Sequence, residues 1–468
     1  MFIQIIINNI RKEESTMKKR ICFLGLAATI IMALTGCGAG AGNETETTTE
    51  VPGLAEANEG RDLLYGLNGK EIDYAAALEK FTESAEKENA DANYYLGYMY
   101  DYALGIEADY VKAMEHYKLA DEGGNLLAKL GMGYLYLNGQ GVEKDRAKAL
   151  EFFENAVKEG CLEANNGLAA YYLTEENSEE YYDEVLAYYE KSITGEEPEF
   201  VGQAYCQIGN IYYDGSGVEV DYTKAMQNFQ KAVEYRDRTA MNMIGILYHY
   251  GYGVEQNYET AMAWYIKSAN LGYATAMSNI ANAYRYAWGV ETDMTTAIQW
   301  YEKAAAVDNL SAMNSLAYIY RYGENGVETN GAKAIEWYTK AANIGDDEAM
   351  NSLAAMYQNG EGVERDYAKA MEWSLKSAEA GNANAMNRVG YMYRKAIGVS
   401  RDDAKAMEWY LKSAEVGNAV AMYNVAFLFY NGYGVEKNLE LALQWATKAS
   451  ESGNENAAEL IEIINNAR

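Results

Sequence analysis

The chain has 468 residues, of which 49% are hydrophobic and 13% aromatic, enough to build a large core or a long array of repeats. Its formal net charge of −30 opposes contact with phosphate backbones, so we expect no nucleic-acid partner. Only Pro52 and Pro198 interrupt the chain with proline, so nearly all of it is free to be helical.

Residues 1–36 are predicted to be a secretory signal peptide. The basic residues 18–20 precede an apolar run over 21–34, which is too short to cross a bilayer as a helix. The following Leu-Thr-Gly-Cys sequence resembles the lipobox of bacterial lipoproteins. That resemblance implies that Cys37 carries the lipid and becomes the N-terminus, and we expect translation to start at Met17.

Residues 37–53 are rich in Gly, Ala, Thr and Glu and have no apolar periodicity. A segment of this composition buries too little surface to fold, so we expect a flexible tether. Acyl chains on Cys37 would hold the body that follows at a membrane, with the tether between them.

From residue 54 to 468 the chain repeats. A small residue recurs in segments that resemble Asp-Tyr-x-Lys-Ala, with steps of 36 residues except for steps of 40 and 37. The extra residues fall near Pro198 and in the loop 323–326, as expected for insertions between repeats. We call this series the marker column; it comprises Ala77, Ala113, Ala149, Val185, Ala225, Ala261, Ala297, Ala334, Ala370, Ala406 and Ala442.

Each unit contains two predicted helices. In the sixth unit, apolar residues from Ala261 to Ala269 recur at helical spacing, and Gly272 is expected to end that helix. A second helix follows with its own recurring alanine, and one such pair cannot bury its apolar faces alone, so the units must stack. The second alanine column comprises Ala92, Ala128, Ala164, Ala204, Ala240, Ala276, Ala312, Ala349, Ala385, Ala421 and Ala457.

Residues 362–386 show the full unit pattern, Gly-Val-Glu-x-Asp-Tyr-x-Lys-Ala-Met-x-Trp-Ser-x-Lys-Ser-Ala, with Ser374 where other units have Tyr. The pattern resembles the Sel1-like repeats, relatives of tetratricopeptide repeats, although Glu follows the loop Val where many members have Pro. The resemblance implies an all-α, right-handed superhelical solenoid of about eleven helix-turn-helix repeats. It also implies a scaffold for protein–protein interaction, often in bacterial envelope or signalling assemblies.

Two columns of the first helices are candidate partner-binding residues. The first lies three residues past the marker and comprises Trp264, Trp300, Trp337, Trp373, Trp409 and Trp445. The second lies six residues past it and comprises Lys267, Lys303, Lys340, Lys376, Lys412 and Lys448.

These columns have two interpretations. The tryptophans either pack against the adjacent unit or anchor a ligand, and the lysines either pair with glutamates one helical turn earlier or face a partner. Since first helices line the concave side of tetratricopeptide-like folds, we expect a Trp–Lys lane in the groove, suited to an acidic or aromatic protein segment.

The sequence contains no pattern that predicts catalysis, a metal site or a cofactor. His116 is expected to be packed and His249 exposed, neither beside a nucleophile. The loop 214–221 lacks the spacing of a calcium site, and Asp221 is interpreted as the start of the next helix. Cys161 and Cys206 are interpreted as thiols, with a disulfide between them left open. We therefore expect a lipid-anchored, extracytoplasmic scaffold without enzymatic activity, or alternatively a lipoprotein that binds glycan or peptidoglycan fragments.

Overall fold

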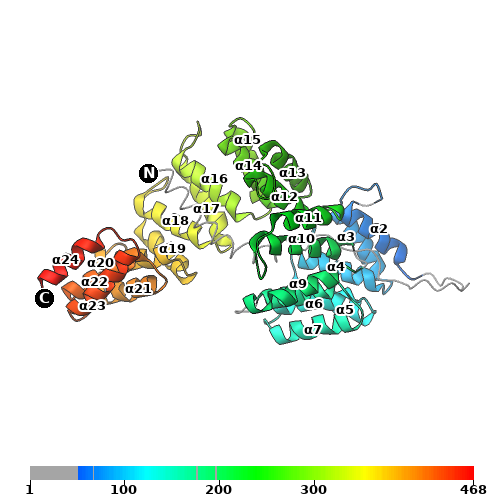
Figure 1. The fold of residues 1–468 in the computed structure, drawn as a ribbon, viewed down its shortest axis with the longest axis horizontal. Coiled ribbons are helices and arrows are strands. Elements are labelled where there is room, and N and C mark those ends of the chain that lie inside the picture. Colours follow the sequence, from blue (N-terminus) through cyan, green and yellow to red (C-terminus); the bar gives the residue numbers. More distant parts are fainter. Residues whose placement is uncertain (1–50, 67, 175–177, 196–197) are drawn as a thin grey trace, which may run out of the picture. The chain divides into compact units, whose positions relative to one another are not determined.

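The structure is a computed structural model that describes residues 51–66, 68–174, 178–195 and 198–468 (Figure 1). The predicted signal peptide and Cys37 lie outside the described residues. Within the described ranges the regular structure is helical, apart from one isolated antiparallel bridge between Glu324 and Val327.

The chain divides into two compact units, one ending at Leu271 and the other beginning at Gly272. The first holds α2 (Leu54–Tyr65), α3 (Tyr74–Ala85), α4 (Ala90–Asp101), α5 (Tyr110–Glu122), α6 (Leu127–Asn138), α7 (Arg146–Lys158), α8 (Ala164–Leu173), η1 (Ser178–Tyr181), α9 (Tyr182–Ser192), α10 (Pro198–Asp214), α11 (Tyr222–Glu234), α12 (Arg238–Tyr250) and α13 (Tyr258–Asn270). The second holds α14 (Ala274–Tyr286), α15 (Met294–Ala305), α16 (Leu310–Tyr322), α17 (Gly331–Asn343), α18 (Asp347–Asn359), α19 (Tyr367–Glu379), α20 (Ala383–Lys395), α21 (Asp403–Glu415), α22 (Ala419–Asn431), α23 (Leu439–Glu451) and α24 (Ala457–Asn466).

The marker column defines the odd-numbered helices from α3 to α23, and the second alanine column defines the even-numbered helices from α4 to α24. The described residues therefore contain eleven helix pairs preceded by α2, which confirms the predicted number of repeats. Both alanine columns are buried, with no member more than 1% exposed. Small side chains at these positions let consecutive helices approach closely.

Short polar side chains start most helices. Asp366 precedes α19, and its Oδ1 accepts a hydrogen bond of 2.9 Å from the backbone N–H of Lys369. The equivalent Asp221 accepts from Thr223 and Lys224, which confirms its predicted role at a helix start. The even-numbered helix α20 begins in the same way at Asn382. These caps satisfy amides that have no partner inside the helix.

Between an even-numbered helix and the next odd-numbered one, a glycine loop folds back onto the preceding pair. Gly434 has φ +67°, a conformation that side chains other than glycine rarely adopt. A Cβ added there would lie 2.3 Å from the carbonyl carbon and oxygen of Asp403 at the start of α21. The loop can therefore cross the helix terminus only because a glycine occupies this position.

The interface between an even-numbered helix and the odd-numbered helix that follows it combines a bulky and a small column. Buried aromatic rings project from most odd-numbered helices four residues past the marker, for example Tyr265 and Tyr410. They cover glycine or alanine on the even-numbered helix, and a Cβ added at Gly245 or Gly390 would lie 2.6 to 2.7 Å from the nearest ring atom. The even-numbered helices thus offer the smaller side chains at this interface.

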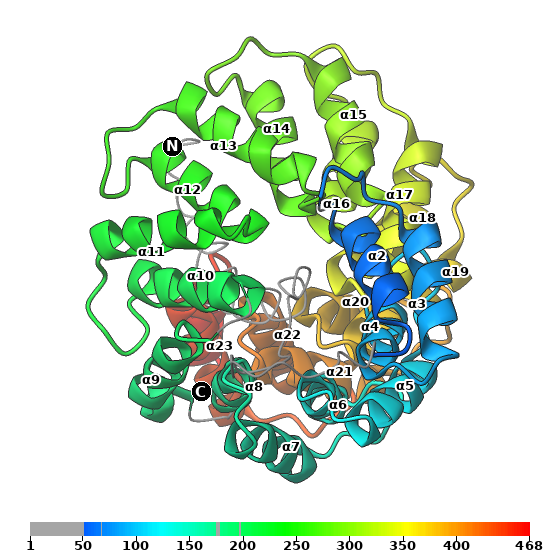
Figure 2. The same cartoon turned by 90° about the vertical axis from the view of Figure 1, so that its right-hand side faces the viewer.

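In the compact unit that ends at Leu271, the even-numbered helices α4, α6, α8 and α10 lie on the inner side of a curve. The odd-numbered helices lie outside them (Figure 2). Successive even-numbered helices also touch each other directly at α4–α6, α6–α8 and α10–α12, and at α22–α24 in the second compact unit. Successive odd-numbered helices have no comparable contact in the described part of the chain. We therefore call the even-numbered helices inner and the odd-numbered helices outer.

Candidate functional site

The predicted Trp and Lys columns both lie on outer helices, from α13 to α23. All six tryptophans are half-buried and all six lysines are exposed. Each lysine ammonium lies over the indole ring three residues before it. The Nζ-to-centroid distance is 3.9 Å for Lys267 and Trp264, and 4.5 Å for Lys448 and Trp445. The other four pairs fall between these values.

The outward placement corrects one expectation. We predicted that the helices carrying the Trp–Lys lane line the concave side, and the arrangement of inner and outer helices shows that this placement is wrong. Whether the lane binds a partner stays a prediction, now for the outer face.

The surroundings of the tryptophans favour packing. Trp409 packs against a cluster around Met392, and Trp445 packs against one around Leu428, in each case the core of the preceding helix pair. The predicted ion pairs one helical turn apart are also present, with 2.9 Å between Lys340 and Glu336. Equivalent pairs join Lys376 to Glu372 and Lys412 to Glu408.

Exposed aromatic side chains gather instead on the inner helices. Five tyrosines there are 40–53% exposed; they are Tyr250, Tyr286, Tyr318, Tyr322 and Tyr391. The rings of Tyr318 and Tyr322 lie 4.8 Å apart on α16, and the Arg285 guanidinium lies over both Tyr286 and Tyr318. Exposed tyrosine beside arginine is typical of surfaces that bind other proteins.

Two inner-helix arginines are neutralised by the loop of the next pair. Arg285 donates from Nε to both carboxylate oxygens of Glu324, at 3.1 and 3.0 Å. Arg321 donates to Glu361 at 2.7 Å. Glu324 belongs to the loop whose extra residue produced the 37-residue step, so the predicted insertion lies between pairs and supplies a carboxylate to the inner surface.

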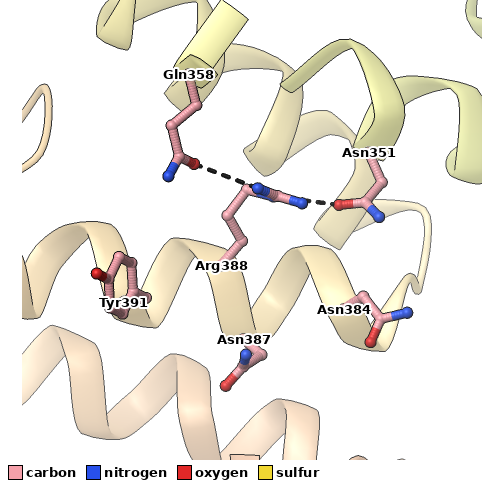
Figure 3. A pocket seen from close by; sticks show the side chains of 6 residues that line it. All are labelled: Asn351, Gln358, Asn384, Asn387, Arg388 and Tyr391. Atoms are coloured by element: carbon pink, nitrogen blue, oxygen red, sulfur yellow. Dashed lines mark hydrogen bonds between the residues drawn. The ribbon is translucent and has the colours of Figure 1, made fainter. Parts of the chain in front are cut away.

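For a third arginine, Arg388 on α20, no carboxylate among the described residues forms such an ion pair. Its Nε donates to Oδ1 of Asn351 at 3.3 Å, and a terminal N–H donates to Oε1 of Gln358 at 3.2 Å, both on α18 (Figure 3). These residues line a pocket on the two inner helices together with Asn384, Asn387 and Tyr391. Burial, and then repulsion from Arg321, lower the pKa of Arg388.

The sequence analysis did not identify this pocket. Arg388 stands where neighbouring units have serine or asparagine, so it belongs to no repeating column. A search for periodicity finds residues that recur in every repeat. The available signal for the pocket was the arginine at a position where the neighbouring repeats have serine or asparagine.

The two histidines differ from expectation in one case. His116 is packed as predicted, its ring stacked on Tyr100 at 5.7 Å. His249 was expected to be exposed, and this is wrong, since only 7% of it is accessible. Tyr250 and Tyr258 meet its ring edge-on at 4.6 and 5.1 Å.

Cys161 and Cys206 are both buried and neither belongs to a disulfide. Burial, followed by the charge of Asp237, raises the pKa of the Cys206 thiol well above its usual value. A thiol in this environment is a poor nucleophile.

Among the described residues, no three His, Cys, Asp or Glu side chains converge in an arrangement that could hold a metal ion. In the same residues, no helix combines the length and apolar character that a membrane crossing requires.

The helix pairs and their inner surface define a repeat scaffold of the kind used for protein–protein interaction. The Sel1 repeat model matches residues 90–125, 126–161, 202–234, 239–273, 274–309, 310–346, 347–382, 383–418 and 419–454. These matches cover more than half of the chain, so the protein belongs to the Sel1 repeat family. Each match begins at an inner helix and ends after the outer helix that follows.

Three solved structures illustrate the similarity. A protective antigen of uropathogenic Escherichia coli with an SLR fold is 27% identical, with 89% of this chain and 88% of that one covered and a TM-score of 0.49. A Sel1 repeat protein from Oxalobacter formigenes is 32% identical over 52% of this chain and 96% of its own, with a TM-score of 0.43. A Klebsiella pneumoniae protein is 24% identical over 44% and 99%, with a TM-score of 0.29. No curated protein matches the chain.

Proposed function

We propose that this protein is a binding scaffold without catalytic activity, anchored by a lipid on Cys37 and extending outward from a bacterial membrane, where it recruits or regulates envelope proteins. The observation that carries the binding role is the concentration of exposed tyrosine on the inner helices. Tyrosine there offers large contact areas with few rotatable bonds, so binding a partner costs little side-chain entropy.

The anchored location rests on the sequence. A basic segment, a short apolar run and a Leu-Thr-Gly-Cys ending precede a composition typical of a tether. A lipid-modified Cys37 would keep the scaffold at the membrane, and a partner captured by it would be held there as well. Replacing Cys37 with Ala is expected to remove the lipid and release the protein into the medium.

Glycan binding, the alternative, receives less support from the tryptophans. A sugar stacks on the flat face of an indole, and each of the six indoles in the column already has a lysine ammonium over its ring. A glycan would have to displace that cation, and it would find the indole half-buried against the preceding pair.

The test is chemical crosslinking of the full chain in the membrane of a bacterium that produces it. Tyr322→Ser and Tyr391→Ser remove exposed rings from the inner helices, and each is expected to reduce the yield of crosslinked partner protein at least about tenfold. Trp373→Ala and Lys340→Glu remove or reverse members of the outer lane. We expect these two variants to retain the partner.

Circular dichroism of every variant checks that the helices remain. Loss of the partner from the outer variants alone would assign binding to the Trp–Lys lane. Saturable binding to isolated cell wall, with no protein captured at fixed stoichiometry, would contradict the proposal and favour the glycan interpretation.

A further inference from the structure

The pocket between α18 and α20 has an unusual hydrogen-bond polarity. Arg388 can only donate, so Asn351 and Gln358 must present their carbonyl oxygens to it, at 3.3 and 3.2 Å. This orientation turns the amide N–H groups of both side chains away from the guanidinium. Within the described residues, no protein acceptor receives a hydrogen bond from either NH₂ group.

The opposite wall of the pocket is arranged in the same way. Asn384 accepts a hydrogen bond of 3.0 Å from Asn418, and Asn387 accepts one of 2.9 Å from Asn424 on α22. The carbonyl oxygens of these two side chains are therefore occupied as well. All four carboxamides that line the pocket use their oxygen on the protein, and their N–H donors remain available.

The positive charge of Arg388 adds to the donor character of the pocket. Arg388 retains N–H groups beyond the two that it donates, and no carboxylate in the described part of the chain forms an ion pair with it. The inner-helix arginines Arg285 and Arg321 each have a glutamate. A partly buried guanidinium that meets only neutral amides is stabilised when an anion joins it. Tyr391, 40% exposed at the pocket rim, adds a hydroxyl.

We propose that this donor-lined pocket binds a carboxylate of a partner protein, with Arg388 as the cation and the amides of Asn384 and Asn387 as additional donors. The planar guanidinium matches a carboxylate in shape and can donate to both of its oxygens. The anion site stands on the geometry alone. That its carboxylate comes from a protein rests on the scaffold function proposed above.

The charge of the whole chain restricts the partner further. A chain with a formal charge of −30 repels a strongly acidic segment at long range. A segment that carries net positive charge and a single carboxylate would be attracted at a distance and fixed locally by Arg388. We therefore infer a basic or neutral partner segment with one acidic side chain, or with its terminal carboxylate, in the pocket.

The test uses acetate as the carboxylate probe on the full chain, with arginine isotope-labelled for NMR and the ionic strength held constant with chloride. We expect acetate to shift the Nε–H resonance of Arg388 saturably, and acetamide, its neutral analogue, to leave it unchanged. Asn384 and Asn387 side-chain resonances should move in the same titration.

Two variant pairs make the result specific. Arg388→Gln should weaken the effect of acetate on the asparagine resonances by about tenfold or more, while Lys412→Gln, with the same change in charge, should not. Tyr391→Glu places a carboxylate one helical turn from Arg388 and should abolish the acetate response, whereas Tyr391→Gln should keep it.

Absence of a saturable shift with acetate would overturn the anion site, even if the inner face still captures a protein. Inorganic phosphate acting at much lower concentration than acetate would overturn the carboxylate assignment. If acetate binds as expected and Arg388→Gln still captures partner protein in full, the pocket binds a carboxylate from another source.

Discussion

Asp101 lies in the compact unit that ends at Leu271, and its carboxyl group is buried. The ionisation of this group should make the stability of the folded protein depend on pH. Its side chain is 7% exposed and accepts a hydrogen bond of 3.1 Å from the Tyr117 hydroxyl. Burial raises the pKa of Asp101 to about 7, and the hydrogen bond only partly opposes this. In the unfolded chain the pKa is about 3.9. The folded state therefore holds a proton between about pH 4 and 7 that the unfolded state has lost.

Because the folded-state pKa is raised, this stabilisation is full below about pH 4 and declines until it is gone above about pH 7. Asp101→Asn keeps the acceptor for Tyr117 and removes the charge. We expect the variant to be more stable than the parent by about 4 kcal/mol at pH 8 and by much less at pH 4.5. Urea unfolding at the two pH values measures the difference.

Asp109→Asn is the matched control, since Asp109 is half-exposed and the backbone N–H of Lys112 lowers its pKa. Its substitution should show the opposite dependence on pH, with less stability than the parent at pH 8. An Asp101→Asn variant with the same advantage at both pH values would show that folding does not raise the pKa of Asp101.

Single residues were predictable from the sequence where they recur and less so where they do not. The markers, the Asp221 cap and the Glu–Lys pairs follow from spacing, because their contacts lie within one helix or between adjacent helices. Arg388 and Asp101 depend on contacts with side chains on other helices. The burial of His249 likewise involves a contact with Tyr258 on the next helix, and a helical wheel does not show what covers a helix.

At the scale of one helix, the residue that precedes each outer helix gives a direct test. Asp366 accepts from the N–H of Lys369 at 2.9 Å. Replacing it with Ala leaves that amide without its cap and should lower the free energy of unfolding by about 1 kcal/mol. Asp366→Asn should cost only a few tenths of that, because asparagine caps other outer helices at Asn257, Asn330 and Asn438.

Hydrogen exchange at the first turn of α19 and the urea midpoint measure the two substitutions together. Equal effects of Ala and Asn would mean that the helix start is held by the preceding loop and not by the side chain. Faster exchange confined to α19 in the Ala variant would support the cap.

The helices themselves were the most predictable feature. Apolar periodicity and the glycine stop placed both helices of the sixth repeat. The sequence did not reveal which helix of a pair is inner, because both carry an apolar stripe. The relevant signal was the glycine or alanine under each aromatic ring, such as Gly245 under Tyr265.

For the whole array, stacking makes the complete helix pair the unit that can be removed. Deleting residues 383–418 removes α20 and α21 and joins Asn382 to Ala419. Asn382 caps α20 just as Asn418 caps α22, each accepting at 2.9 Å from the backbone N–H three residues later. After the deletion, Asn382 can therefore take over the cap of α22, and inner and outer helices still alternate.

We expect this 36-residue deletion to give a folded helical monomer, because each pair contacts mainly its neighbours and α22 can pack on α19 as α20 does now. Deleting only residues 383–402 removes α20 and its loop, so two outer helices, α19 and α21, become neighbours. Their aromatic columns would then meet each other without the small residues of an inner helix between them, and the exposed apolar stripes should cause aggregation.

Circular dichroism and size-exclusion chromatography with light scattering compare the two deletions. Equal behaviour would mean that alternation of inner and outer helices does not determine how the array packs.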